Sequence, residues 1–299
     1  MTIAPIAPSA RHLFCFGCGY TARVLARTVL AEGGRVSGTC RNDDGVAALE
    51  HDGICGHRFD GSGPLDARVF AGVTDLLVSI PPGPEGDGVL AWHAQMLAGC
   101  ASLGWIGLLS TTGVYGDCGG AWIDESQPLA PRTDANRWRV AAETSWRNFG
   151  EEARKPVQVF RLPGIYGPGR SPFDPLRAGV AQRIVKPGQV FNRIHVDDIA
   201  AALRAAMDRP AAGPIFHLAD DEPTPADHVL SHAAGLLGLA PPPEVPIDAA
   251  GLSPMALHFY AECKRLENDR MKAELGIVLR HPTYREGLAA ILEAEGAGG

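Results

Sequence analysis

The chain has 299 residues, a formal net charge of -7 at pH 7, 45% hydrophobic residues and 7 cysteines. This length suffices for a full hydrophobic core, and an acidic balance without any basic block argues against nucleic acid as a partner. No apolar run approaches the roughly 20 residues of a membrane span, so no membrane partner is expected. The scattered cysteines, odd in number, favour the reducing cytoplasm, and residues 1–10 are expected to form a loose tail rather than a signal peptide.

A glycine-rich turn follows the first predicted strand. The apolar segment that begins at Leu13 leads into a G-x-G-x-x-A pattern, and a helical stretch, 23–32, follows at once. The pattern consists of Gly17, Cys18, Gly19, Tyr20, Thr21 and Ala22. In such a turn the first glycine permits the bend, the second lets the backbone approach a pyrophosphate, and the small third residue lets helix and strand pack closely. Because another strand is predicted at 35–39, the order indicates a dinucleotide-binding unit.

Cys15 and Cys18 form a C-x-x-C pair inside this segment. Cys18 occupies a variable position of the glycine turn, and no second cysteine–histidine pair with ligand spacing accompanies the two thiols. We therefore expect no metal site and no dithiol chemistry here.

The end of the second predicted strand indicates which nicotinamide cofactor is bound. About 20 residues past the glycines, an NAD site usually offers Asp or Glu to the ribose 2′-hydroxyl. The segment 37–42 contains no acidic residue and includes Arg41, whose guanidinium can bind a 2′-phosphate through two hydrogen bonds. We predict that NADP(H) is preferred over NAD(H); the alternative is that Arg41 is a solvated loop residue.

Strands and helices alternate along the first half of the chain. Further strands are predicted at 56–59, 74–80, 105–110 and 157–162, and helices at 88–103 and 134–151. This alternation is typical of an α/β protein with a Rossmann-type, doubly wound parallel sheet.

Two domains are expected. Residues 1–162 are predicted to form an NAD(P)-binding Rossmann domain, to which 193–219 returns with one helix and one strand. Residues 163–192 and 220–299 are predicted to form a smaller C-terminal substrate lobe, with helical stretches at 254–275 and 284–295.

Three further segments carry a family resemblance. They are Leu109–Gly116 (LSTTGVYG), Arg161–Arg170 (RLPGIYGPGR) and Arg193–Ala200 (RIHVDDIA). In this order, and together with the glycine turn, they resemble the extended short-chain dehydrogenase/reductase family, also called the NAD-dependent epimerase/dehydratase family. The resemblance covers nearly the whole chain. It implies a Rossmann sheet, bound NAD(P), and a lobe that closes over a small-molecule substrate, often a nucleotide-sugar.

The chain departs from the family at the catalytic pair. Members carry Tyr-x-x-x-Lys in the helix after the first of these segments, with a glutamate four residues past the lysine. Alignment on Glu143 places Arg139 at the lysine position and Ala135 at the tyrosine position, and 134–145 contains neither residue type. Arginine keeps its proton at physiological pH, so Arg139 can bind or polarise but is a poor acid.

The literal Tyr260-x-x-x-Lys264 lies in the lobe. We expect these two residues to be packing neighbours on one helix, although Tyr260 could line the substrate cleft.

The resemblance also implies the other site residues. Thr111 matches the hydroxyl that hydrogen-bonds the reacting oxygen, with an ordinary strand end as the alternative, and Tyr115, normally structural, is a candidate replacement acid. The implied cofactor contacts are Asp60 for adenine (or simple turn chemistry), Ser79, Ile80 and Pro81 for the adenosine side or ribose, and Pro163, Gly164 and Ile165 for the nicotinamide. His195, Asp197 and Asp198 fall where the family starts a packing helix, and one of the two aspartates is expected to cap it.

Two features bear on the substrate. Residues 170–193 carry five cationic side chains against one acidic residue, which suits a phosphorylated or carboxylated substrate or is simply a solvated surface. Dehydratases of the family have Asp-Glu where this chain has Thr112 and Gly113, which disfavours sugar-nucleotide dehydration.

The first hypothesis is an NADP(H)-dependent oxidoreductase or epimerase-like enzyme with an atypical active site. Its substrate would be small, polar, and either a nucleotide-sugar or another anion. The alternative is a non-catalytic NAD(P)-binding sensor or regulatory protein. Either would be a monomer or a homodimer.

Overall fold

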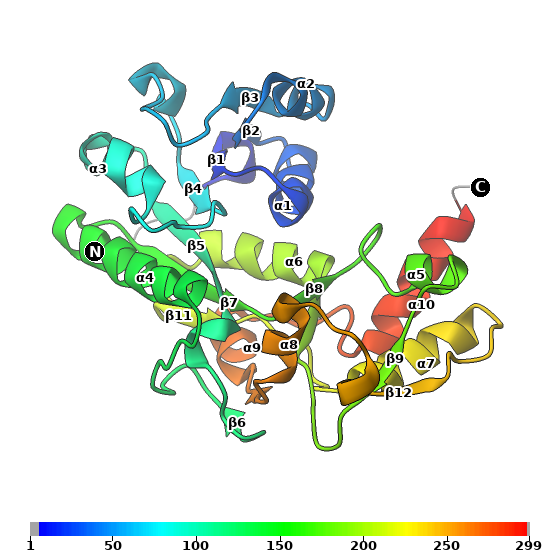
Figure 1. Ribbon diagram of the computed structural model, residues 1–299. Coiled ribbons are helices and arrows are strands. Elements are labelled where there is room, and N and C mark those ends of the chain that lie inside the picture. The colour runs from blue at the N-terminus through cyan, green and yellow to red at the C-terminus, as the bar shows by residue number, and fades with distance from the viewer. Residues whose placement is uncertain (1–5, 298–299) are drawn as a thin grey trace.

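The computed structural model describes residues 6–297, and its main feature is a seven-stranded sheet in the order β11-β7-β5-β4-β1-β2-β3 (Figure 1). All neighbouring strands are parallel. The strands are β1 (His12–Phe16), β2 (Arg35–Cys40), β3 (Cys55–Arg58), β4 (Asp75–Val78), β5 (Trp105–Thr111), β7 (Val157–Leu162) and β11 (Ile215–His217). This topology confirms the predicted Rossmann-type α/β fold.

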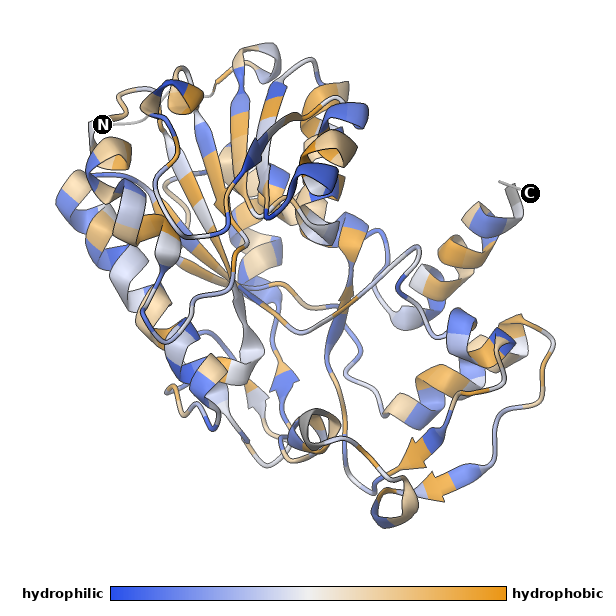
Figure 2. Cartoon of the chain, turned by 45° about the horizontal axis from the view of Figure 1, so that its top comes forward, coloured by the Kyte–Doolittle hydropathy of each residue, from blue (hydrophilic) through white to orange (hydrophobic). Residues whose placement is uncertain are grey.

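Helices cover both faces of the sheet. They are α1 (Tyr20–Ala31), α2 (Asp43–His51), α3 (Gly88–Gly99), α4 (Asp134–Ala153) and α6 (Val196–Met207). One core contains side chains of α1 and α6, and the core on the opposite face contains side chains of α3 and α4. Because the central strands are buried on both sides, they are apolar along most of their length, as Figure 2 shows.

A separate core lies beside the sheet. It is formed by α5 (Phe173–Arg177), α7 (Ala226–Leu236) and α10 (Tyr284–Ala297), with Tyr166 from the chain that leaves β7. Two two-stranded parallel sheets accompany it: β8 (Gly164–Tyr166) with β10 (Arg193–His195), and β9 (Arg183–Val185) with β12 (Glu244–Pro246). A further parallel pair, β6 (Trp122–Ile123) with β13 (Arg265–Leu266), packs in a different cluster with Val114 and Tyr115. Short 3-10 helices are η1 (Pro8–Ala10), η2 (Ala67–Phe70), η3 (Thr112–Tyr115) and η4 (Ile247–Ala249).

The helix predicted over 254–275 is wrong. The structure has α8 (Pro254–Tyr260), the short strand β13, and then α9 (Asp269–Leu275). Met271 and Leu275 of α9 pack into the core shared with α1 and α6, so this part of the expected lobe lies against the sheet. The points where α8 ends and α9 begins are set by burial against residues distant in sequence, and a local sequence pattern carries no information on such contacts.

Two other helices differ from expectation. The first helix begins at Tyr20, three residues before the predicted start, and α2 had not been predicted. Its start is nevertheless well marked, because the Asn42 side chain accepts from the N–H of Gly45 at 2.9 Å. Across residues 6–297, no helix has both the length and the hydropathy needed to cross a bilayer.

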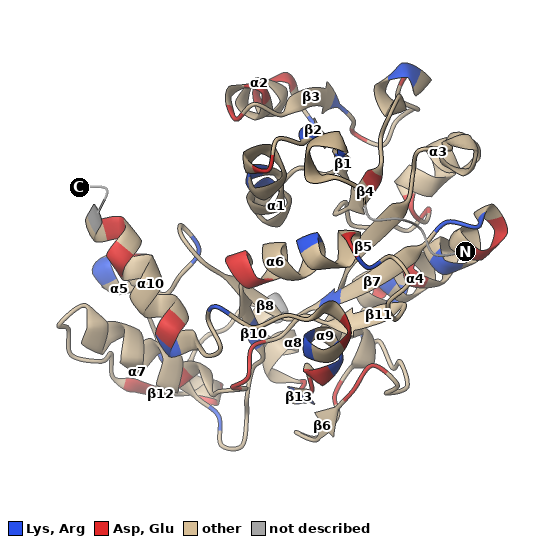
Figure 3. Cartoon of the chain, turned by 180° about the vertical axis from the view of Figure 1, so that it is seen from behind, with Lys and Arg blue, Asp and Glu red and all other residues tan. Residues whose placement is uncertain are grey.

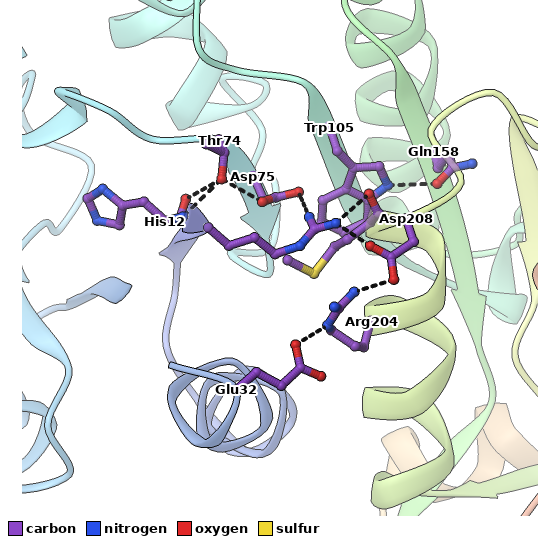
Figure 4. A network of polar contacts seen from close by, with 10 residues as sticks. His12, Glu32, Thr74, Asp75, Trp105, Gln158, Arg204 and Asp208 are labelled. Atoms are coloured by element: carbon purple, nitrogen blue, oxygen red, sulfur yellow. Dashed lines mark hydrogen bonds and ion pairs between the residues drawn. The ribbon is translucent and has the colours of Figure 1, made fainter. Parts of the chain in front are cut away.

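An ionic network, buried at Arg11 and Asp75 and partly exposed at Asp208 and Glu32, joins elements at the amino ends of the strands (Figure 4). Arg11 contacts Asp208 and donates from Nη1 to Oδ1 of Asp75 at 2.8 Å. Asp208 pairs with Arg204, which in turn binds Glu32 of the segment after α1 at 2.7 Å. These contacts tie β4 and α6 to the residues just before β1 and just after α1. They therefore hold the C-terminal end of α1, the helix that follows the glycine turn.

Candidate functional site

The glycine turn lies at the carboxyl edge of the sheet, between β1 and α1. Gly17 has φ +82°, and a Cβ on it would lie 2.9 Å from Cγ1 of Ile80, so both conformation and contact require glycine. The N–H of Gly17 donates to Oγ1 of Thr39 at 2.8 Å, and that of Cys18 donates to the Thr39 carbonyl at 2.9 Å. These two groups therefore hold the turn to β2 and do not face a ligand.

The backbone N–H groups that remain free follow this turn, at the start of α1. Gly19 is the N-cap and has no side chain to cap the helix, and the N–H of Arg23 makes the first bond back to its carbonyl. Within the described part of the chain, the N–H groups of Tyr20, Thr21 and Ala22 have no hydrogen-bond partner. A Cβ on Gly19 would meet nothing within 4 Å, so the turn is open there. Three free donors at the positive end of a helix fit a phosphate.

The strand order reverses beside this turn, because β1 lies between β2 and β4. Ligands of such sheets bind in the crevice outside the carboxyl ends at this point. The structure brings Ser79 and Ile80 here: the N–H of Ser79 donates to the Phe16 carbonyl at 2.9 Å, and Ile80 touches Gly17. Pro81 follows them.

Asp60 lies two residues beyond β3 and is exposed. Its carboxylate accepts from the N–H and the hydroxyl of Ser62 at 3.0 and 2.6 Å, as in a simple turn. The adenine contact implied for Asp60 stays a prediction.

Arg41 follows β2 directly and is exposed. Because β2 pairs with β1, the backbone of Arg41 is at the same sheet edge as the glycine turn. No ion-pair partner for it exists among residues 6–297. Its role in binding a 2′-phosphate stays a prediction.

Thr111 ends β5, and its pairing partner on β7 is Leu162, directly before Pro163. The predicted substrate residue and the predicted nicotinamide segment, Pro163–Ile165, are therefore neighbours at one sheet edge. The Thr111 hydroxyl accepts from the N–H of Gly113 at 3.2 Å and is half-buried.

Tyr115 is only 1% exposed, and its hydroxyl is fully engaged. It accepts from Nη1 of Arg161 at 2.6 Å and lies 2.5 Å from Nε2 of His217. Burial raises the pKa of Tyr115 to about 12. These contacts leave the hydroxyl no route to a substrate, which contradicts Tyr115 as a replacement acid.

The same network includes Glu143 of α4. Its carboxylate accepts from Nη2 of Arg161 at 2.6 Å and from the hydroxyl of Ser110 at 2.5 Å. One turn earlier, Nη1 of Arg139 donates to the Leu109 carbonyl at 2.8 Å, so its guanidinium is tied to the backbone of β5. Neither Arg161 nor His217 was predicted as a member of this network from the sequence, although charged or polar residues inside apolar strands were an available signal.

The buried His217 predicts a loss of stability in acid. Burial lowers the pKa of His217 to about 4, from an ordinary value of 6.5. Between these values the unfolded chain binds a proton that the folded chain does not, so stability is full above pH 6.5 and falls as the pH drops toward 4, by up to about 3 kcal/mol. Urea unfolding from pH 7 to 4 should show a flatter dependence in His217→Gln than in the natural chain. Equal slopes would contradict this assignment.

The start of α6 corrects one expectation. Neither aspartate caps the helix: the N-cap is His195, whose Nδ1 accepts from the N–H of Asp197 at 3.2 Å. Asp198 is buried, and its carboxylate accepts from the N–H groups of Arg280 and His281 at 2.7 and 3.0 Å. It therefore holds the segment before α10 against α6.

Most cations of residues 170–193 are engaged within the protein; Figure 3 colours the Lys, Arg, Asp and Glu positions along the chain. The contacts are Arg177 with Glu295, Arg183 with Glu244, Lys186 with Gln189, and Arg193 with the Thr224 carbonyl. Arg170 alone among these five lacks such a contact within residues 6–297, and it lies 5.8 Å above the ring of Tyr20.

Tyr260 and Lys264 do not share a helix, contrary to expectation. Tyr260 ends α8, whereas Lys264 lies in the extended segment beyond it. Its Nζ donates to the Gly116 carbonyl at 2.5 Å and to Glu262 at 2.7 Å. Lys264 therefore anchors the loop after η3.

The fold defines a broad class of protein. The chain has the fold of solved epimerase structures that bind nicotinamide cofactors. Over 94% of this chain it superimposes on the human epimerase family protein SDR39U1 with NADPH (99% of that chain, TM-score 0.70, 18% identity). Over 94% it also superimposes on UDP-glucuronic acid 4-epimerase from Bacillus cereus in complex with NAD (97% of that chain, TM-score 0.74, 14% identity). No family model matches the sequence.

Within this class, the chain belongs to one family with a conserved protein from Silicibacter pomeroyi DSS, described as functionally unknown. The two are 48% identical over 95% of this chain and 99% of that one, with a TM-score of 0.88. The chain is also 36% identical over 179 residues to 3-diazoavenalumate denitrifying reductase of Streptomyces sp, across 56% of this chain and 58% of the reductase, which is less than two thirds of its length. It is 29% identical over 239 residues to Protein YeeZ of Escherichia coli strain K12, across 76% of this chain and 84% of that protein.

Proposed function

We propose that this protein is an NADP(H)-dependent reductase of the extended short-chain dehydrogenase type that acts on a small, polar, anionic substrate. The observation that carries the proposal is the set of three free N–H groups at the start of α1, with Arg41 at the same sheet edge. The NADPH of the human structure and the NAD of the Bacillus structure support a nicotinamide cofactor for this fold.

The residues present fit this cofactor. Tyr20, Thr21 and Ala22 would bind the diphosphate, Arg41 the 2′-phosphate and Asp60 the adenine. Ser79–Pro81 would line the ribose, and Pro163–Ile165 the nicotinamide. When bound, the nicotinamide supplies a hydride. Thr111, at the neighbouring strand end, would orient the substrate by a hydrogen bond.

Helix α4, which corresponds to the helix that carries the catalytic tyrosine in the family, provides no phenol. Arg139 is tied to a backbone carbonyl and Tyr115 is locked in the core. Lack of a general acid costs a carbonyl reduction about 10²–10⁴ in rate. We infer that the substrate is an electron-poor group, such as a diazonium or an iminium, that accepts a hydride without a proton from the protein. The denitrifying activity in the name of the Streptomyces relative supports a reductase over a sugar epimerase.

Arg170, which within residues 6–297 contacts the Tyr20 ring but forms no ion pair, supports an anionic substrate, carboxylated or phosphorylated. We propose the cytoplasm as the compartment, which the 7 unpaired cysteines support, and a monomer or homodimer as the assembly.

Calorimetry with NADPH and NADH tests cofactor binding first. NADPH consumption is then followed with aryl diazonium, iminium, carbonyl and nucleotide-sugar compounds, using deuterated NADPH to trace the hydride into the product. We expect deuterium in the reduced diazonium or iminium compound. If neither coenzyme binds, the proposed function is wrong.

A non-catalytic sensor is the second candidate, and the engaged Tyr115 and Arg139 favour it. NADPH binding with no turnover of any of the four compound classes would select it over the reductase.

A further inference from the structure

Two histidines and a carboxylate meet where α6 approaches the chain before α10. Asp197 Oδ2 lies 3.7 Å from Nδ1 of His195 and 3.9 Å from Nε2 of His281. One ligand atom from each of the three residues lies within 4.8 Å of the others, and the two imidazole centroids are 4.0 Å apart. The function proposed above uses none of these groups.

The imidazoles are buried and incompletely satisfied. His195 is 2% exposed and His281 is 5% exposed. Their Nε2 atoms are buried and have no hydrogen-bond partner in the described range. A buried polar atom without a partner costs about 1–3 kcal/mol. Nε2 of His281, which lies 3.9 Å from Asp197 Oδ2, therefore calls for a ligand or another physical reason, whereas Nε2 of His195 points away from the carboxylate, which its Nδ1 faces.

We propose that His195, Asp197 and His281 bind a divalent transition-metal ion of the zinc type. Imidazole nitrogens and a carboxylate oxygen are ligands that zinc takes at about 2.0–2.2 Å, and three protein ligands leave a fourth position for water or substrate. The Asp197 side chain is 39% exposed, which opens that position to solvent. The observed separations require the three side chains to close inward on binding.

The surroundings favour and oppose the ion in identifiable ways. Asp198 fixes the backbone of Arg280 and His281 by accepting one N–H bond from each, and it places a second carboxylate in the same turn as Asp197. The positive N-terminal end of α6 and the exposed Arg280 repel a cation and so disfavour its binding. An ion on Nδ1 of His195 also replaces the bond from the Asp197 N–H, so metal binding and helix capping compete.

Metal binding would join α6 to the chain before α10, and hence the sheet to the lobe. Titration of the full chain with Co²⁺ or Zn²⁺, after chelator treatment, tests this. We expect one equivalent to bind, with the Co²⁺ spectrum showing ligand-field bands and no thiolate charge transfer, and the Tm to rise with metal concentration. Asp197→Asn and His281→Gln should each weaken binding at least about 100-fold, the upper end of what loss of an outer-shell partner costs.

The parent and all variants carry Cys55→Ser, because Sγ of Cys55 lies 3.7 Å from Nε2 of His57 on the surface and this pair could bind metal itself. His228→Gln, at an exposed histidine, is the matched control and should bind as the parent does. Folding of every variant is checked by circular dichroism. The proposal is overturned if the parent binds no ion, or if folded Asp197→Asn and His281→Gln bind it as tightly as the parent.

Discussion

Replacing Arg41 with alanine should weaken NADP(H) binding about 10–100-fold while leaving NAD(H) binding within about twofold. The physical reason is that the guanidinium, exposed at the end of β2, would donate charge-assisted hydrogen bonds to the 2′-phosphate, each worth about 1.5–3 kcal/mol. NAD(H) has no phosphate at that position. Calorimetric titration of both coenzymes against the variant measures the two ratios.

Arg147→Ala is the matched control, because Arg147 is another exposed arginine and lies on α4. It should change neither affinity beyond the small effect of one surface charge. An equal loss of both coenzymes in Arg41→Ala would refute the 2′-phosphate assignment while leaving the diphosphate site at α1 standing.

Glu143→Ala should destabilise the fold by about 3–5 kcal/mol. Glu143 and Arg161 are each 3% exposed, and removing the carboxylate leaves the guanidinium buried with an uncompensated charge. It also frees the hydroxyl of Ser110. At roughly 2–4 °C per kcal/mol for large domains, the Tm should fall by about 10 °C. Urea unfolding and thermal scans measure both quantities.

Glu143→Gln should recover part of this loss, since an amide oxygen still accepts from Arg161 or Ser110. Glu151→Ala, at an exposed position of the same helix, should stay within about 0.5 kcal/mol of the natural chain. A loss in Glu143→Ala no greater than in Glu151→Ala would show that the buried pair contributes little.

The predictable part of this fold rests on local patterns. The apolar strands and the G-x-G-x-x-A turn depend on residues close together in sequence, and they led to the parallel sheet and to a helix after the turn, although α1 begins three residues before the predicted start. The failure to predict α2 also concerns a local pattern, since its Asn42 cap is present in the sequence and was overlooked. By contrast, the break between α8 and α9 depends on burial of Met271 against α6 and against α1, the latter more than 200 residues away in the sequence.

For the site, the sequence by itself determined the types of residue at each strand end: a glycine turn, Arg41 in a segment (37–42) without an acidic residue, Thr111, and a helix lacking Tyr and Lys. Only the tertiary structure decided which of their atoms are free. The Gly17 N–H is taken by Thr39, and the Tyr115 hydroxyl by Arg161. The physical reason is that a buried polar group must find a partner, and in a parallel sheet that partner comes from another strand, distant in sequence.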